Sequence, residues 1–236
     1  MDLPEWIVTD LDDTLLLEDR SVGKASLEII ARIRQKGVQF AIATTRNKSF
    51  AQSYIDQLNP DVSVVSGGAL TYKGSTIIRK RTLDESQIDT IYQTLGGNFS
   101  IDKIVIDSIA GRFVDLNEIK EIPSNSIFSL FIWTDENLGL LKTDSNAIEI
   151  TRLWEDKMYR ISHKEASKHA ALLDLLKDHE PEKVITFGDD LMDIGMLKHF
   201  NGVAVANALE EVKEAAKEIT QSNRQQGVAK YLERFL

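Results

Sequence analysis

The sequence predicts an α/β protein with a Rossmann-like, doubly wound, mostly parallel sheet into which a smaller α+β module is inserted. Short apolar runs alternate with amphipathic segments up to about residue 65, and the same alternation returns after residue 163. Between them, strand-like runs follow one another with little helix. Alternation of strands and helices is typical of a parallel sheet covered on both faces, whereas crowded strands favour an antiparallel sheet. We therefore expect a core of residues 1–81 and 163–236 and an inserted domain of residues 82–162.

The first half of the core should contain three strands, two helices and a hairpin. The strands are apolar throughout, the helices have one apolar face, and Gly37 and Asn59-Pro60 follow the helices as stop signals. In chain order we expect a strand at 6–9, a helix at 24–36, a strand at 38–43, a helix at 49–58, a strand at 62–65, and a hairpin of 70–72 with 76–78.

The inserted domain should begin with a helix that ends at Gly96-Gly97. Apolar and β-branched runs then predict strands at 101–106, 112–116, 127–133, 147–154 and 158–162. The second half of the core should resume with a helix at 166–178, a strand at 184–187, a helix at 191–199, a strand at 203–206 and a helix at 209–219.

Composition narrows the classes of function. The chain has 236 residues and 42% hydrophobic content, which suits a packed core, and its formal net charge of -9 disfavours nucleic acid and anionic membranes as partners. The absence of cysteine excludes disulfides, Cys-ligated zinc and a thiol nucleophile. The N-terminal segment MDLPEWIVTD has neither a basic region nor a long apolar run, so we expect a cytoplasmic protein. We expect it to be a monomer or a homodimer.

Polar side chains follow three of the predicted parallel strands directly. Ligand sites of open α/β sheets lie beyond the carboxyl ends of the strands, so these side chains should share one site. They are Asp10 and Asp12 after the first strand, Thr44, Thr45 and Arg46 after the second, and Asp189, Asp190 and Asp193 after 184–187, with Lys168 in the preceding helix.

This combination of side chains suits phosphoryl transfer with Mg²⁺. Carboxylates are preferred ligands of a hard cation, and hydroxyl and ammonium groups can hold phosphoryl oxygens. The cation would also offset the repulsion among the crowded carboxylates of TDLDDTL, residues 9–15.

Four motifs resemble those of the haloacid dehalogenase superfamily. The segment DLDDTL at residues 10–15 resembles the DxDx[TV][LV] first motif, Thr44 the second-motif Ser/Thr, Lys168 the third-motif basic residue, and GDDLMD at residues 188–193 the GDxxxD fourth motif. The C-terminal VAVANALEEVKEAA, with Thr220, Asn223 and GVA at 227–229, resembles the Cof-type, sugar-phosphatase-like branch. The insertion between Thr44 and Lys168 is where that branch carries its cap domain.

The resemblance implies a role for each matching residue. Asp10 would be the nucleophile that forms an aspartyl-phosphate, and Asp12 the general acid and then the general base. Thr44, Lys168, Thr45 and Arg46 would bind the phosphate. The Mg²⁺ would be held by Asp10, the main-chain carbonyl of Asp12 and Asp189, with Asp193 either as a further ligand or as a residue that orients the ligands. The expected substrate is a small phosphorylated metabolite, either a sugar phosphate or a phosphorylated cofactor.

Some residues depart from the branch pattern or have a simpler explanation. Gly67 and Met192 replace polar residues of the usual motifs, while Asp13, Thr45 and His169 replace glycines. Arg46 is equally well explained as a residue that contacts substrate and as a residue that faces solvent. The negative charge of Asp190 is explained by its favourable interaction with the dipole of the helix that follows it. The four histidines lack metal-ligand spacing. Trp133 and Trp154 are expected in the core of the inserted domain.

Three alternatives remain open at this point. A response-regulator receiver also uses acids, a Thr and a Lys, but places its Lys last in the chain. A protein of the same fold could bind a phospholigand for regulation with little turnover. A phosphomutase is the third alternative, although such enzymes more often carry the cap between the first two motifs.

Overall fold

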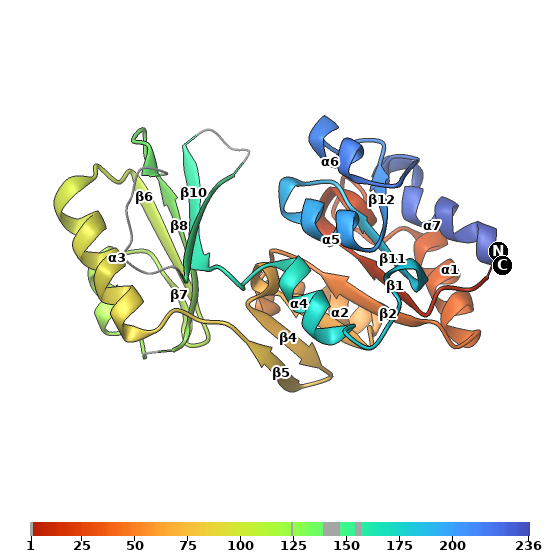
Figure 1. Ribbon diagram of the computed structural model, residues 1–236, viewed down its shortest axis with the longest axis horizontal. Helices are drawn as coiled ribbons and strands as arrows, with labels where there is room; N and C mark the ends of the chain where they lie inside the picture. The colour runs from red at the N-terminus through yellow and green to blue at the C-terminus, as the bar shows by residue number, and fades with distance from the viewer. Residues whose placement is uncertain (1, 124, 139–146, 154–156) are drawn as a thin grey trace. The chain divides into compact units, whose positions relative to one another are not determined.

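The computed structural model describes residues 2–123, 125–138, 147–153 and 157–236. Within it the chain forms two compact units, residues 1–79 with 167–236 and residues 80–166. Each unit has a sheet and helices of its own (Figure 1). Each also has its own hydrophobic core.

The larger unit is built on an eight-stranded sheet in the order β13-β12-β11-β1-β2-β3-β4-β5. The first six strands of that order are parallel, and β4 pairs antiparallel with β3. Their bounds are β1 Trp6–Thr9, β2 Gln39–Ala43, β3 Val62–Val65, β4 Leu70–Lys73, β5 Thr76–Lys80, β11 Val184–Gly188, β12 Asn201–Val205 and β13 Glu218–Thr220. This sheet confirms the predicted doubly wound α/β class.

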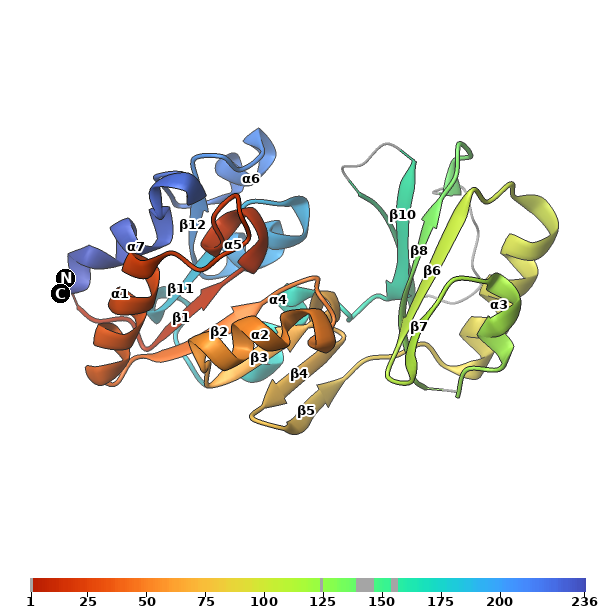
Figure 2. The ribbon, with the colours of Figure 1, turned by 180° about the vertical axis from the view of Figure 1, so that it is seen from behind.

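Helices cover both faces of this sheet because successive strand side chains point to opposite sides. Ile7 packs with α1 (Lys24–Gln35) and α7 (Gly227–Leu232), which contact each other (Figure 2). Its neighbours Trp6 and Val8 pack instead with α4 (Lys168–Leu175) and α5 (Ile194–His199). The remaining helices of the unit are α2 (Lys48–Leu58) and α6 (Glu210–Ala215).

The end of the predicted helix 209–219 is wrong. Helix α6 stops at Ala215, and Glu218–Thr220 forms β13, which pairs in parallel with β12 at the edge of the sheet. The strand is short and largely exposed, so it lacks the run of buried apolar residues that marks the central strands. The predicted helix 191–199 likewise begins as a 3₁₀ turn, Leu191–Asp193, before α5.

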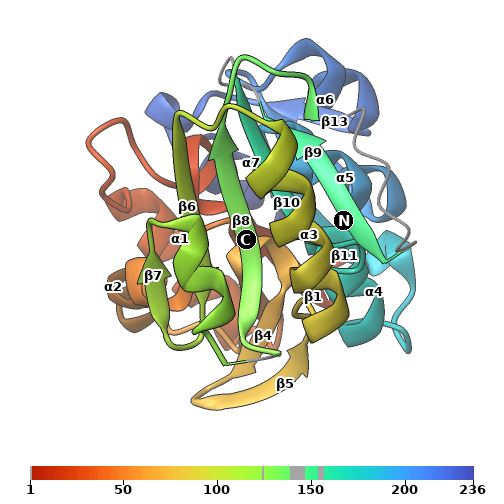
Figure 3. The same ribbon diagram turned by 90° about the vertical axis from the view of Figure 1, so that its left-hand side faces the viewer.

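The smaller unit is an antiparallel sheet in the order β7-β6-β8-β10-β9, with α3 packed on one face (Figure 3). Its bounds are β6 Lys103–Ser108, β7 Gly111–Phe113, β8 Ile127–Trp133, β9 Ile148–Arg152, β10 Met158–His163 and α3 Glu85–Asn98. Asp84 begins α3 with a capping box to Gln87, and the predicted end at Gly96-Gly97 is wrong because the helix continues through both glycines to Asn98. The Lys103 Nζ lies 4.3 Å from the ring centroid of Trp133, whereas Trp154 lies outside the described residues.

Candidate active site

Asp10 occupies the first position after β1, at the carboxyl end of a central strand. Its backbone N–H donates to the carbonyl of Phe187 at 3.0 Å, which continues the pairing of β1 with β11. The chain then turns back, and the Leu16 N–H closes the turn on the carbonyl of Leu11 at 2.8 Å. Asp13 adopts φ 54° within this turn, and its carbonyl accepts from Nδ2 of Asn207 at 2.7 Å. The turn thus places Asp10 and Asp12 on the sheet edge.

Lys168 bridges two buried carboxylates. Its Nζ lies 2.8 Å from Oδ1 of Asp10 and 2.6 Å from Oδ1 of Asp193. The Lys168 side chain is 1% exposed and lies at the start of α4, which Ser167 caps by accepting from the Ala170 N–H. Burial lowers the pKa of Lys168, but the charges of Asp10 and Asp193 outweigh that effect and raise it. The ammonium is therefore held charged between the two carboxylates.

Asp193 is fixed by hydrogen bonds at both oxygens. Beyond its contact with Lys168, its Oδ2 accepts from the backbone N–H groups of Asp189 at 3.1 Å and Asp190 at 3.2 Å. Gly188 permits this approach, because a Cβ there would lie 2.4 Å from the Cβ of Asp193. The motif spacing G-D-x-x-x-D thus forms a closed loop around the Asp193 carboxylate.

Asp189 belongs to the same carboxylate cluster as Asp10 and Asp193. Its Oδ1 accepts from the Thr14 hydroxyl at 2.5 Å, which joins the first and last motifs. Burial, with the charge of Asp193 adding to it, raises the pKa of Asp189 to about 7. Burial also raises the pKa of Asp10, against the opposing effect of Lys168. These carboxylates are therefore costly to keep charged unless more positive charge is present.

The three carboxylates fit a divalent cation. One oxygen each from Asp10, Asp189 and Asp193 lies within 4.8 Å of the others. Lys168 supplies one positive charge against three carboxylates, so the group retains negative charge that a hard cation would neutralise. Among the described residues no other group of three such side chains was found, and none of the four histidines belongs to this one.

Asp12 points to a different set of partners. Arg46 donates to both of its oxygens, from Nε to Oδ2 and from Nη2 to Oδ1, each at 2.7 Å. Arg20 donates from Nη1 to Oδ1, also at 2.7 Å. Burial raises the pKa of Asp12, but the hydrogen bonds and charge of Arg46, together with Arg20, outweigh it and lower the pKa overall. Arg20 was missed by the sequence analysis, since no motif or periodicity marks its position.

Thr44 and Thr45, the two hydroxyl residues directly after β2, differ in burial. Thr44 is fully buried, and its hydroxyl oxygen accepts from the Arg46 N–H at 3.2 Å. The hydroxyl hydrogen has no acceptor within the described chain, so it remains available to a ligand. The Thr45 side chain is exposed. Thr44 is thus the hydroxyl of this segment that is positioned as a donor.

The turn of residues 66–68 packs against the start of α4. A Cβ on Gly68 would lie 2.1 Å from the carbonyl oxygen of Ser167, and the φ of Gly68 is 96°. Arg79 fixes the turn by donating from Nη1 to the Gly68 carbonyl at 2.7 Å. Glycine is therefore required at residue 68, because only a residue without a side chain allows this approach to Lys168.

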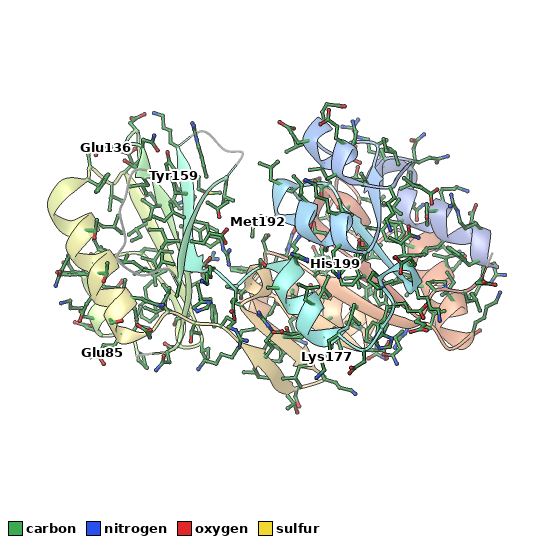
Figure 4. All side chains as sticks on the ribbon, viewed as in Figure 1. Glu85, Glu136, Tyr159, Lys177, Met192 and His199 are labelled. Atoms are coloured by element: carbon green, nitrogen blue, oxygen red, sulfur yellow. The ribbon has the colours of Figure 1, made fainter. Side chains whose placement is uncertain are left out.

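The remaining candidates have structural partners. Asp190 accepts from the Leu191 N–H at 2.6 Å, at the start of the turn before α5, and burial raises its pKa. His179 contacts Glu5 through Nδ1 at 2.6 Å and accepts from Nε1 of Trp6 at 3.3 Å. Met192 is partly buried within the fourth motif, and His199 ends α5 (Figure 4).

Comparison with known proteins assigns the family. A model of haloacid dehalogenase-like hydrolases matches residues 7–126 and 117–232. The chain belongs to the haloacid dehalogenase-like hydrolases. This membership confirms the recognition based on the four motifs. No helix in the described ranges is long and apolar enough to cross a membrane.

Individual members of this hydrolase family align over nearly the whole chain. A putative phosphatase of Haemophilus influenzae is 26% identical over 98% of this chain and 97% of its own length. A 5-amino-6-(5-phospho-D-ribitylamino)uracil phosphatase of Bacillus subtilis is 24% identical, with coverage of 98% and 97%. The crystal structure of a haloacid dehalogenase-like hydrolase from Bacteroides thetaiotaomicron shares the fold, with a TM-score of 0.84, 22% identity and coverage of 99% and 100%.

Proposed function

We propose that this protein is a Mg²⁺-dependent phosphatase that hydrolyses a small phosphomonoester through an aspartyl-phosphate. The observation that carries the proposal is the contact of the buried Lys168 ammonium with Asp10 and Asp193, at the carboxyl edge of the sheet beside Asp189. Membership of a hydrolase family with phosphatase-named relatives supports it. A sugar phosphate or a phosphorylated cofactor is the expected substrate class.

Each catalytic step uses a residue of the chain. A carboxylate oxygen of Asp10 attacks phosphorus, the bond from phosphorus to the ester oxygen breaks, and Asp12 protonates the departing alkoxide. Asp12 then takes a proton from a water molecule that attacks phosphorus, which releases inorganic phosphate and restores the Asp10 carboxylate. Lys168 orients Asp10 throughout, because its Nζ holds Oδ1 at 2.8 Å.

Substrate binding requires donors for the phosphoryl oxygens. Thr44 would donate its free hydroxyl hydrogen to a phosphoryl oxygen. The Lys168 ammonium would interact electrostatically with the bound phosphoryl group as well as with the two carboxylates. Thr45 and Arg46 were predicted to share this task. The side chain of Thr45 is exposed, so the proposal that Thr45 binds the phosphate has weaker support than the proposal for Thr44. The guanidinium of Arg46 faces Asp12, which we place on the side of the leaving group.

Asp10, the main-chain carbonyl of Asp12, and Asp189 would hold Mg²⁺, which supplies positive charge against the repulsion between a carboxylate and a phosphate dianion. Asp193 fits an orienting role better than direct ligation, because both of its oxygens already accept hydrogen bonds. Residues 80–166 are proposed as the cap that selects substrate. We expect the protein to act in the cytoplasm, as a monomer or homodimer.

The test is phosphate release from p-nitrophenyl phosphate and a panel of metabolite phosphates, with Mg²⁺ or with EDTA. We expect turnover only with Mg²⁺ and a loss of about 10³-fold or more in Asp10→Asn. Asp56→Asn is the matched control, because Asp56 is exposed on α2 and accepts a hydrogen bond from Gln52 of the same helix. Binding of phosphate without turnover of any substrate would favour the regulatory alternative.

A further inference from the structure

A short hairpin places Arg20 beside the site. Leu16 and Val22 pair as an antiparallel bridge, and the Leu17 N–H donates to the Ser21 carbonyl at 2.9 Å. The Arg20 N–H donates back to the Leu17 carbonyl at 2.9 Å, so residues 17–20 close a tight turn. Arg20 therefore projects from the tip of a hairpin that begins directly after the first motif.

The backbone of Arg20 is in a conformation that favours glycine. Its φ is 64°, in the left-handed region, which costs a residue with a Cβ about 1 kcal/mol or more. The Tyr54 hydroxyl on α2 fixes this tip by donating to the Arg20 carbonyl at 2.9 Å. An arginine at a position suited to glycine points to a role of its side chain.

Two guanidinium groups converge on one carboxylate. Arg20 and Arg46 both donate to Oδ1 of Asp12 at 2.7 Å, and Arg46 also lies 5.0 Å above the ring centroid of Tyr54. Tyr54 thus supports both arginines, one through its hydroxyl and one through its ring. The Asp13 carboxylate lies 3.6 Å from Nη1 of Arg20, beyond hydrogen-bond distance.

Arg20 retains donors for a ligand. Only Nη1 is engaged; within the described ranges its Nε and Nη2 have no protein acceptor, and its side chain is 51% exposed. By contrast, Arg46 uses Nε and Nη2 on Asp12 and is only 25% exposed. The guanidinium fork matches the two oxygens of a carboxylate or of a phosphate.

We infer that Arg20 is a specificity-determining residue that binds a second anionic group, a carboxylate or a phosphate, on the leaving group of the phosphomonoester. The inference rests on the proposed function, because it takes Asp12 to contact the leaving oxygen. The Arg20 donors then lie roughly 6 Å from that oxygen, about two hydrogen-bond lengths away. An anionic group three or four bonds beyond the ester oxygen reaches them.

A purely orienting role of Arg20 on Asp12 predicts a different outcome. It would change the turnover of every substrate by the same factor and would leave ligand preference unchanged. A specificity role changes the preference between two ligands that differ only in the second anion. Glycerol 3-phosphate and 3-phosphoglycerate are such a pair, since a hydroxymethyl group in one replaces the carboxylate in the other.

The experiment measures the Kd of both ligands by calorimetry in the Asp10→Asn background, where neither is consumed. We expect 3-phosphoglycerate to bind about tenfold more tightly, equivalent to about 1.4 kcal/mol, and Arg20→Gln to reduce that preference to about twofold or less. Arg20→Gly should reduce the preference to the same extent, and it also removes the backbone strain at residue 20, because glycine adopts a positive φ readily. Arg224→Gln is the matched control, because Arg224 pairs at 2.6 Å with Glu18 of the same hairpin but does not contact Asp12.

Glycerol 2,3-bisphosphate and glycerol 3-phosphate extend the test to a second phosphate, whose phosphorus lies four bonds from the ester oxygen. An Arg20-dependent preference in either pair supports the inference and identifies the anion. Equal affinities within both pairs, or preferences that persist in Arg20→Gln and Arg20→Gly, would overturn it. Phosphate release by the wild type is measured separately, so a protein that shows the preference without turnover would refute the proposed function and leave Arg20 only as the binding residue for a second anion.

Discussion

The Nζ of Lys168 lies 2.8 Å from Oδ1 of Asp10, and both side chains are almost completely buried. The ion pair joins the end of β1 to the start of α4, which are separated by the whole smaller unit in the sequence. Burial raises the pKa of Asp10 while Lys168 opposes that rise, so the charge of one side chain depends on the other. The same ion pair should therefore contribute both to the free energy of unfolding of the larger unit and to its proposed catalytic activity.

Replacing Lys168 should damage both stability and activity. Lys168→Met leaves the carboxylates of Asp10 and Asp193 buried without their cation, which typically costs about 3–5 kcal/mol. Urea unfolding measures this loss, and phosphate release measures the activity. Lys177→Met is the control, because Lys177 is exposed just after the same helix (Figure 4) and should change the free energy of unfolding by less than about 0.5 kcal/mol. A Lys168→Met protein as stable as the control would show that the carboxylates are not charged.

Replacing Arg46 should shift the pH dependence of the reaction. Burial alone would raise the pKa of Asp12, but the hydrogen bonds from Arg46 reverse that effect and lower it. In Arg46→Gln the pKa of Asp12 should rise, so the general acid stays protonated to higher pH. The limb of kcat/KM against pH that reports the titration of Asp12 should therefore move to higher pH. Arg34→Gln is the control, because it removes an arginine that is paired with Asp61, and it should leave the limb in place. If the limb does not move in Arg46→Gln, Asp12 is not the residue that transfers the proton.

Asp189 should make the metal-free protein less stable as pH rises. Burial, with the charge of Asp193, raises its pKa in the folded state to about 7 from 3.8, so the folded state binds a proton that the unfolded state has released. This stabilisation is complete below about pH 4 and is lost as pH rises through about 7. In EDTA, the Tm of Asp189→Asn should gain several degrees relative to the wild type between about pH 5 and pH 8. A constant difference in Tm would contradict the raised pKa.

Gly188→Ala should disturb the fourth motif without changing any charge. The added Cβ would lie 2.4 Å from Cβ and 2.7 Å from Oδ2 of Asp193, so the Asp193 side chain must shift from its position. We expect a loss of about 1–3 kcal/mol in unfolding free energy and a lower kcat/KM. Gly96→Ala in α3 is the control, since among the described residues no atom beyond its chain neighbours and its own helix backbone lies within 4 Å of the added Cβ, and stability should rise slightly. Equal stability of the two variants would argue against the tight packing at Gly188.

The sequence predicted most of the core sheet because its central strands are apolar on both faces. Strands such as Trp6–Thr9 are buried along their whole length, and the polar residue after each lies at a common edge. This geometry explains why Asp10, Lys168, Asp189 and Asp193 come together from distant segments. The edge strand β13 was not predicted, because three largely exposed residues carry no such pattern.

The surroundings of Asp12 could not be predicted in the same way. Arg20 reaches Asp12 only because residue 20 adopts a positive φ at a hairpin tip, and Tyr54 fixes that tip from a separate helix. A turn conformation of this kind has no periodicity in the sequence. Arg46 was weighed between substrate contact and solvent exposure, whereas the structure places its guanidinium on both oxygens of Asp12.

The most direct test of the account follows the phosphoryl group in Asp12→Asn. p-Nitrophenyl phosphate has a leaving group that needs no acid, so Asp10 should still be phosphorylated while the water step fails. With Mg²⁺ we predict a burst of about one p-nitrophenolate per chain, and a hydroxylamine-sensitive phosphate on the peptide that contains Asp10. A burst with the phosphate on another residue, or turnover without any covalent phosphate, would contradict the assignment of Asp10 as the nucleophile.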